Sequence, residues 1–164
     1  MALTKDERRA LELAREKIAS EQAAVVCYAL KLASEEYPDL RQAVERLQDY
    51  IGVALEGGGS TLTRWQLENG FYRGNVRADR LAWIDWMLGK PLPGEAVEIK
   101  WKAVGYKIEE GEYCGRFFRI VWAEFQQRWL ITELNEMGVV TAAFAVNKRT
   151  EIDAAIVAHV WPEA

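Results

Sequence analysis

The sequence holds few of the residues from which catalytic and metal sites are built. Among 164 residues it has two cysteines, Cys27 and Cys114, and one histidine, His159. Two cysteines form neither a disulfide framework nor a four-ligand zinc site, and a single histidine excludes metal sites that need several. Cys114 with His159 is the one thiol–imidazole pair that remains. Because His159 has apolar neighbours on both sides, we expect it to be a packed histidine.

Recognisable catalytic motifs are missing as well. The sequence contains no dinucleotide-binding fingerprint, nucleophile elbow or calcium loop. The glycines at 57–59 lack the preceding strand and the Gly-Lys-Ser ending of a phosphate-binding loop, so they predict a connection between helices. Carboxylate pairs such as Glu35-Glu36 and Glu109-Glu110 lie in charge-rich stretches, where solvated surface is a simpler explanation than acid–base catalysis. We therefore expect a protein that is not an enzyme and holds no metal or cofactor, with carboxylate-only chemistry as the open alternative.

Neither an excess of basic charge nor a long apolar run is present. The net charge is −4, with 13 basic and 14 acidic residues up to position 94, and 8 and 11 after it. Nucleic-acid binders usually present a basic surface, so general DNA binding is disfavoured. No run approaches the roughly 20 apolar residues of a membrane span, and the charged N-terminal sequence lacks a signal-peptide pattern. These features predict a cytoplasmic protein with no membrane partner.

What the sequence does have is apolar mass and a change of hydrophobic period. Half of its residues are hydrophobic and seven are tryptophan, which suffices for a core. Up to Pro91-Leu92-Pro93-Gly94 the apolar residues recur at helical spacing, and after it they alternate as in strands. The sequence therefore predicts an α+β protein, with a helical bundle over 1–90 and an antiparallel sheet plus C-terminal helix over 95–164. Because the linker is short, we expect the two halves to pack on each other.

The helical half shows start and stop signals for at least three helices. Thr4 begins a capping-box pattern, which predicts a first helix to about Ala19. Ser20 is a plausible cap for a second helix, and Pro38 fits the first position of a third. The third helix has an apolar stripe at helical spacing, made of Leu40, Val44, Leu47, Ile51 and Leu55.

A last helix of this half is expected over 76–88. Asn75 can cap its start, Gly89 can end it, and the prolines of the linker prevent its continuation. Its expected inner residues are Leu81, Ile84 and Leu88. This helix therefore leaves a polar outer face for contacts outside the bundle.

The second half predicts a four-stranded antiparallel sheet with one covering helix. The apolar phase of the first strand slips by one residue, which predicts a β-bulge near Ala103-Val104. Glu109 to Glu112 has the composition of a hairpin turn. Further strands are expected over 116–124, 129–134 and 139–146, followed by a helix over 150–160. Short links between the strands favour antiparallel neighbours.

Candidate binding residues lie on the outer face of the last helix of the bundle. Arg73, Arg77 and Arg80 are spaced four and three apart, with Tyr72 beside them. Such a stripe can bind phosphates or an acidic protein surface. The alternative is a solvated face that pairs with nearby carboxylates. These carboxylates are Glu68, Asp79 and Asp85.

Tryptophans near the junction of the halves are a second kind of candidate. Most of the seven tryptophans are expected in the core, because they fall within regular elements. Trp86 and Trp101 lie on either side of the linker, where an exposed aromatic would anchor a protein partner.

Four segments of the helical half resemble small helical proteins of bacteriophages and prophages. They are Val-Cys-Tyr-Ala-Leu (26–30), Tyr-Pro-Asp-Leu (37–40), Thr-Leu-Thr-Arg-Trp (61–65) and Arg-Leu-Ala-Trp-Ile-Asp-Trp-Met (80–87). The resemblance covers about residues 5–88 and supplies no catalytic residues. We expect an accessory protein of a phage or mobile element that binds a host or phage protein, for example as an inhibitor of a host antiviral defence. The alternative is a nucleic-acid-binding module that uses the arginine stripe, with Lys100 and Lys102.

Overall fold

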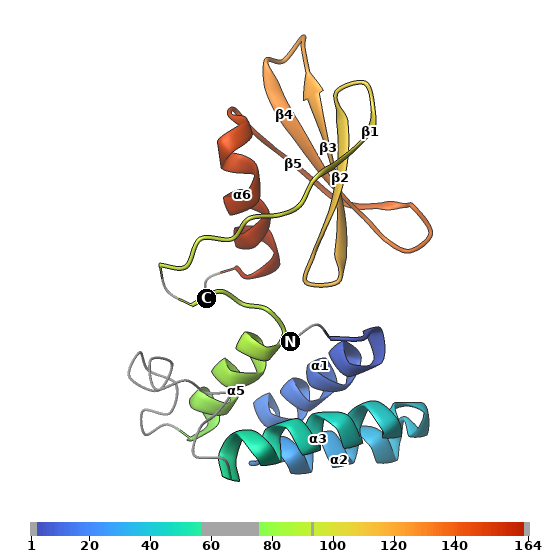
Figure 1. The fold of residues 1–164 in the computed structure, drawn as a ribbon, viewed down its shortest axis with the longest axis vertical. Coiled ribbons are helices and arrows are strands. Elements are labelled where there is room, and N and C mark those ends of the chain that lie inside the picture. Colours follow the sequence, from blue (N-terminus) through green and yellow to red (C-terminus); the bar gives the residue numbers. More distant parts are fainter. Residues whose placement is uncertain (1–2, 57–75, 93, 163–164) are drawn as a thin grey trace. The chain divides into compact units, whose positions relative to one another are not determined.

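The computed structural model describes residues 3–56, 76–92 and 94–162, and the chain divides into two compact units (Figure 1). Met1–Lys90 form the helical unit and Pro91–Ala164 form the sheet unit. The α+β prediction is confirmed, because helices are followed by an antiparallel sheet and a final helix. Within the described ranges, no helix has both the length and the apolar character needed to cross a membrane.

Local capping signals explain where the first helix of the helical unit begins and where its last helix ends. Its described elements are α1 (Lys5–Ala19), α2 (Val26–Glu36), the 3-10 turn η1 (Pro38–Leu40), α3 (Arg41–Glu56) and α5 (Val76–Met87). Thr4 caps α1 as predicted, since its Oγ1 accepts a hydrogen bond from the Glu7 amide at 3.1 Å. Gly89 follows α5 with a φ of 108°, the left-handed region in which glycine is favoured. The predicted cap Asn75 and the glycines at 57–59 lie outside the described residues.

The predicted role of Ser20 is wrong. Ser20 ends α1, because its amide donates to the Glu16 carbonyl at 2.9 Å, and Glu21 then takes a left-handed φ of 64°. Helix α2 begins only at Val26, with no side-chain cap. Ser20 therefore occupies the carboxyl end of one helix and does not satisfy the first amides of the next.

The core of the helical unit uses most of the predicted positions. The stripe of η1 and α3 is confirmed by the burial of Leu40, Val44, Leu47 and Ile51, while the side chain of Leu55 lies outside the described ones. The buried residues of α5 and its end are Trp83, Ile84, Met87 and Leu88. Leu81 is only half-buried, so the inner face of α5 is turned slightly from the predicted one.

The sheet unit has five strands where four were predicted. They are β1 (Lys102–Gly105), β2 (Ile108–Tyr113), β3 (Arg116–Ala123), β4 (Arg128–Leu134) and β5 (Val140–Val146), all antiparallel and in sequence order across the sheet. The extra strand arises because the chain turns at Lys107, which has a left-handed φ of 55°. The predicted hairpin at Glu109 to Glu112 is wrong, because these residues lie within β2.

The actual turn after β2 is made by Cys114 and Gly115. Both residues have positive φ, 52° and 74°, as the two central positions of a type I′ hairpin turn require. The predicted irregularity in the first strand is confirmed, since the β1–β2 register shifts between Ala103 and Gly105. The turn at Cys114 and Gly115 thus sets the register of β2 against β3, with Tyr113 opposite Arg116.

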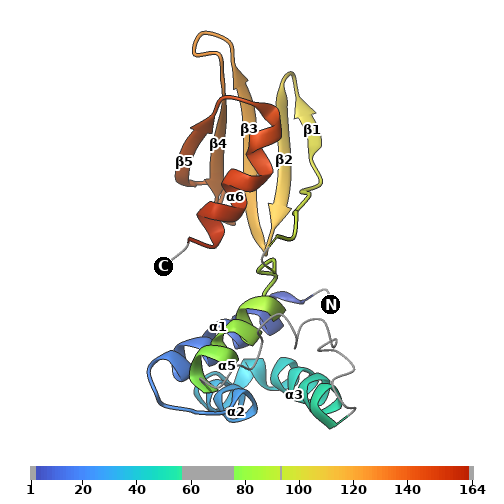
Figure 2. The same cartoon turned by 90° about the vertical axis from the view of Figure 1, so that its left-hand side faces the viewer.

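One face of the sheet is covered by α6 (Ile152–Val160), as Figure 2 shows. The side chains buried between them are Ile99, Phe118, Ile120, Ile131, Ile152 and Ile156. The predicted helix over about 150–160 is present, although its first turn is the 3-10 turn η2 (Arg149–Glu151) and no side chain caps either element. The opposite face of the sheet has no covering element within the described sheet unit.

Candidate functional site

The arginines of the predicted stripe make contacts inside the helical unit. Tyr72 and Arg73 lie outside the described residues. Arg77 forms an ion pair with Glu21, and Arg80 donates a hydrogen bond to the backbone carbonyl of Ala24. Glu21 and Ala24 both belong to the connection between α1 and α2. The two described arginines therefore hold that connection against α5, which reduces their availability for phosphates.

The two candidate tryptophans belong to different units. Trp86 is half-buried in α5. Trp101 is half-buried in the sheet unit, where its indole Nε1 donates to Asp153 of α6 at 2.8 Å. The Arg149 guanidinium lies 5.6 Å from the centre of the Trp101 ring, within the range of a cation–π contact. Trp101 thus already packs against two elements of its own unit.

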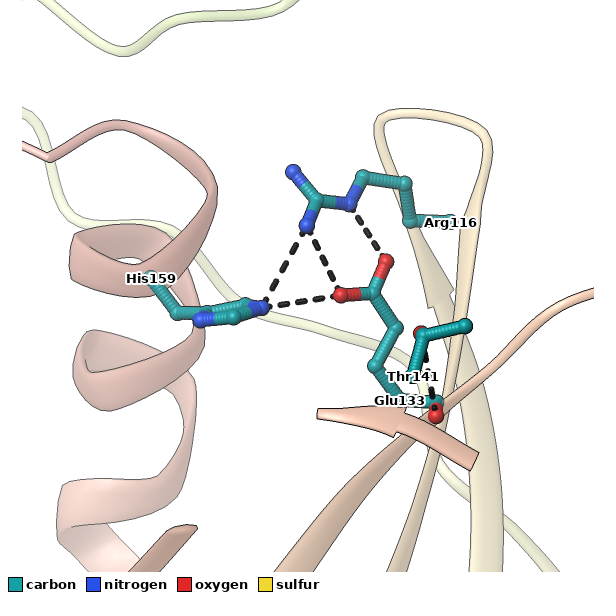
Figure 3. Close-up of polar contacts among 4 residues, drawn as sticks. All are labelled: Arg116, Glu133, Thr141 and His159. Carbon is teal, nitrogen blue, oxygen red and sulfur yellow. Dashed lines mark hydrogen bonds and ion pairs between the residues drawn. The ribbon is translucent and has the colours of Figure 1, made fainter. Parts of the chain in front are cut away.

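A charged cluster that joins α6 to the sheet includes the one histidine (Figure 3). Arg116 of β3 makes two hydrogen bonds to the Glu133 carboxylate of β4, at 2.6 and 2.7 Å. His159 Nε2 of α6 lies 2.8 Å from the same carboxylate. The imidazole ring also packs on Phe144, with the ring centres 4.9 Å apart. His159 is therefore a packed residue, as its apolar neighbours predict.

The Glu133 carboxylate is the central acceptor of this cluster. The hydrogen bonds from Arg116 hold the pKa of Glu133 below its ordinary value against the opposing effect of burial, with His159 adding to the lowering. An ionised carboxylate can only accept hydrogen bonds, and His159 Nε2 lies 3.3 Å from Arg116 Nη2 as well as beside this carboxylate. The Thr141 hydroxyl donates to the backbone carbonyl of Glu133 at 3.3 Å (Figure 3). The contacts of Arg116, Thr141 and His159 converge on Glu133, and we assign the cluster a structural role.

Metal binding has no support in the described part of the chain. Within residues 3–56, 76–92 and 94–162, no three side chains of His, Cys, Asp or Glu are grouped so that they could hold a metal ion.

The uncovered face of the sheet gathers apolar side chains, and we call it the open face. Its apolar members are Ile108, Phe117, Val121, Leu130, Leu134 and Val140. The strand register aligns Phe117, Leu134 and Val140 in one cross-strand row. Phe117 is 47% exposed and Val140 is 53% exposed, although both are large apolar side chains. Exposed apolar residues that are contiguous in this way are typical of interaction sites.

An ion pair lies on the open face beside the row that contains Phe117. Arg119 of β3 donates to Glu110 of β2 at 2.7 Å, and both side chains are about half exposed. A hollow of about 530 Å³ lies beside it, with Glu110, Glu112, Phe117 and Leu134 among its lining residues. The open face thus combines apolar side chains with a few charges and a concave region.

Sequence reasoning missed the open face, although β3 contains a signal for it. The pairs Phe117-Phe118 and Ile120-Val121 place an apolar side chain on each side of the strand. A strand with one solvated face would alternate apolar with polar residues. Consecutive apolar residues therefore indicate that both faces of this sheet are apolar, while α6 covers only one.

Comparisons with known proteins give no information on the function of the chain. No family model matches the chain, and no match was found among curated proteins or solved structures. The resemblance of residues 5–88 to bacteriophage proteins stays a prediction.

Proposed function

We propose that the chain acts by binding another protein through the open face of its sheet, with Phe117 as the main anchor. The observation that carries this proposal is the aligned row of Phe117, Leu134 and Val140, in which Phe117 and Val140 are exposed and Leu134 is half-buried. Protein interfaces have an aromatic and aliphatic centre with a polar rim. Here the Arg119–Glu110 pair supplies polar groups beside that centre.

The partner that fits this face is a protein with an apolar surface and few charges at its centre. A nucleic acid would meet the carboxylates of Glu110 and Glu112 beside Phe117. Arg119 neutralises Glu110, but Glu112 and Glu136 outnumber Lys102 among the other charges that line the hollow, so the face favours a protein over a polyanion. The resemblance to bacteriophage proteins supports a host or phage protein as the partner, and inhibition of a host antiviral defence is the role we propose for such binding.

Phe117 and Phe125 allow a matched test of this surface. Phe125 lies in the turn after β3 and is fully exposed, so Phe125→Asp makes the same chemical change away from the open face. We expect Phe117→Asp to abolish capture of the partner from a bacterial lysate, because a charge at an interface centre costs about 2 kcal/mol or more, roughly thirtyfold in affinity. Phe125→Asp should capture the partner like the unchanged chain. The measurement is a pull-down followed by titration of the captured protein.

Two results would contradict the role of the open face. The first is a partner that Phe117→Asp still binds with unchanged affinity. The second is an equal loss of binding in both variants, which would indicate a non-specific effect of the added charge. Circular dichroism of both variants checks that the sheet is intact.

Nucleic-acid binding through the arginine stripe has a separate test. Because Arg77 and Arg80 make contacts within the helical unit, we expect no salt-dependent mobility shift with DNA or RNA. A shift that weakens steeply with salt and disappears in Arg77→Ala/Arg80→Ala would favour the nucleic-acid alternative. Lys31→Ala/Lys148→Ala, which removes two exposed charges outside the proposed nucleic-acid surface, is the control.

A further inference from the structure

The edge strand β5 lacks the charged residues and prolines that usually prevent an edge strand from pairing with another chain. In the described part of the chain β5 has β4 as its one strand neighbour, so every second residue turns its backbone N–H and C=O groups outward. The sequence has no charged residue and no proline between Glu136 and Lys148. Figure 2 shows β5 at the border of the sheet, with α6 lying across its face. This edge is therefore open to pairing with another strand.

The other edge of the same sheet is protected. Strand β1 has only four residues, it carries Lys102, and its register is broken between Ala103 and Gly105. Short length, lysine and bulges are the devices by which proteins prevent pairing at a sheet edge. Strand β5 also has a register shift, opposite Glu133 and Leu134, but it is seven residues long and carries neither lysine nor proline. The sheet thus protects the β1 edge more strongly than the β5 edge.

We propose that β5 pairs with β5 of a second copy of the chain, antiparallel and about a two-fold axis. Pairing of β5 with β1 of another copy would be head-to-tail and would extend without limit, but the protection of β1 disfavours it. Pairing of β5 with β5 of a second copy uses the same edge on both chains, so the assembly stops at a dimer. The strand is self-compatible, because no like charges face each other across the axis in the uncharged segment 137–147.

The dimer would enlarge the surface proposed above without depending on it. Two strands related by a two-fold axis perpendicular to the sheet keep the same face on the same side. The two five-stranded sheets then form one continuous sheet, with the α6 helices on one side and both open faces on the other. The dimerisation contact uses backbone groups at the edge, whereas partner binding uses side chains on the face.

A charge placed near the two-fold axis tests the pairing. Ala143 is exposed near the middle of β5, so Ala143→Lys sets two lysines near each other across the axis. Sedimentation equilibrium should give twice the 18.7 kDa mass for the unchanged chain. Ala143→Lys should weaken association at least about tenfold, because like charges on paired strands repel. Val104→Lys adds the same charge to the protected edge strand and should leave the dimer intact.

A charge swap separates repulsion across the axis from loss of the fold, because only folded variants can recover the dimer when they are mixed. Ala143→Lys and Ala143→Glu should each associate at least about tenfold more weakly alone, and an equimolar mixture of the two should recover the dimer mass. A monomeric unchanged chain across the concentration series would overturn the proposal. So would a dimer that Ala143→Lys leaves unchanged. Phe117→Asp removes the proposed anchor for partner binding. If this variant still forms the dimer, dimerisation does not depend on the partner-binding surface.

Discussion

Replacing Asp85 with asparagine is expected to destabilise the helical unit by about 2–3 kcal/mol, because it breaks an ion pair whose carboxylate is buried. Arg15 of α1 donates two hydrogen bonds to Asp85 of α5, at 2.5 and 3.1 Å. The Asp85 side chain is only 9% exposed. The hydrogen bond to Asp85 also raises the pKa of the Arg15 guanidinium, against the opposing effect of burial.

Asp39 provides the matched control for this experiment. It also pairs with an arginine in the helical unit, since Arg9 lies 3.1 Å away, but its side chain is 65% exposed. An exposed pair contributes about 0–1 kcal/mol, so Asp39→Asn should shift stability much less. Urea unfolding, together with amide hydrogen exchange in α1 and α5, measures both variants. Equal effects of the two substitutions would show that burial does not set the strength of the Asp85 pair.

The Arg15–Asp85 pair illustrates what the sequence can and cannot predict about the helical unit. The ends of α1 and α5 were predictable, because Thr4 and Gly89 act on their own helices. The ion pair joins helices that are far apart in the sequence, and no local pattern selects Arg15 among the arginines. The same reason explains why Arg77 pairs with Glu21 and not with a carboxylate of its own helix.

The sheet unit shows the same division between local and non-local information. Three strands and the final helix followed from alternation and period, but the turn at Lys107 was missed because lysine is not a typical turn residue with positive φ. A missed turn changes the strand count and moves Glu109 to Glu112 from a loop into β2. The open face could not be predicted from residue types alone. It depends on α6 covering only one of two apolar faces.

Two cross-strand Arg–Glu pairs lie on opposite faces of the same sheet and should differ in strength. Glu133 faces α6 with a side chain that is 12% exposed, whereas Glu110 lies on the open face and is 42% exposed. We expect Glu133→Gln to cost about 2 kcal/mol at neutral pH, because Arg116 and His159 both lose a charged acceptor. Glu110→Gln should cost less than about 1 kcal/mol, as exposed pairs do.

The pH dependence of the Glu133 effect has a definite sign. Because Arg116 lowers the pKa of Glu133 in the folded chain, the ionised carboxylate contributes stability above the unfolded pKa and loses it as the pH falls through the folded value. The difference between the unchanged chain and Glu133→Gln should thus be constant above about pH 5 and shrink below about pH 4. Urea unfolding at a series of pH values measures it. A difference that grows with acid would show that the charge of Glu133 does not hold α6 to the sheet.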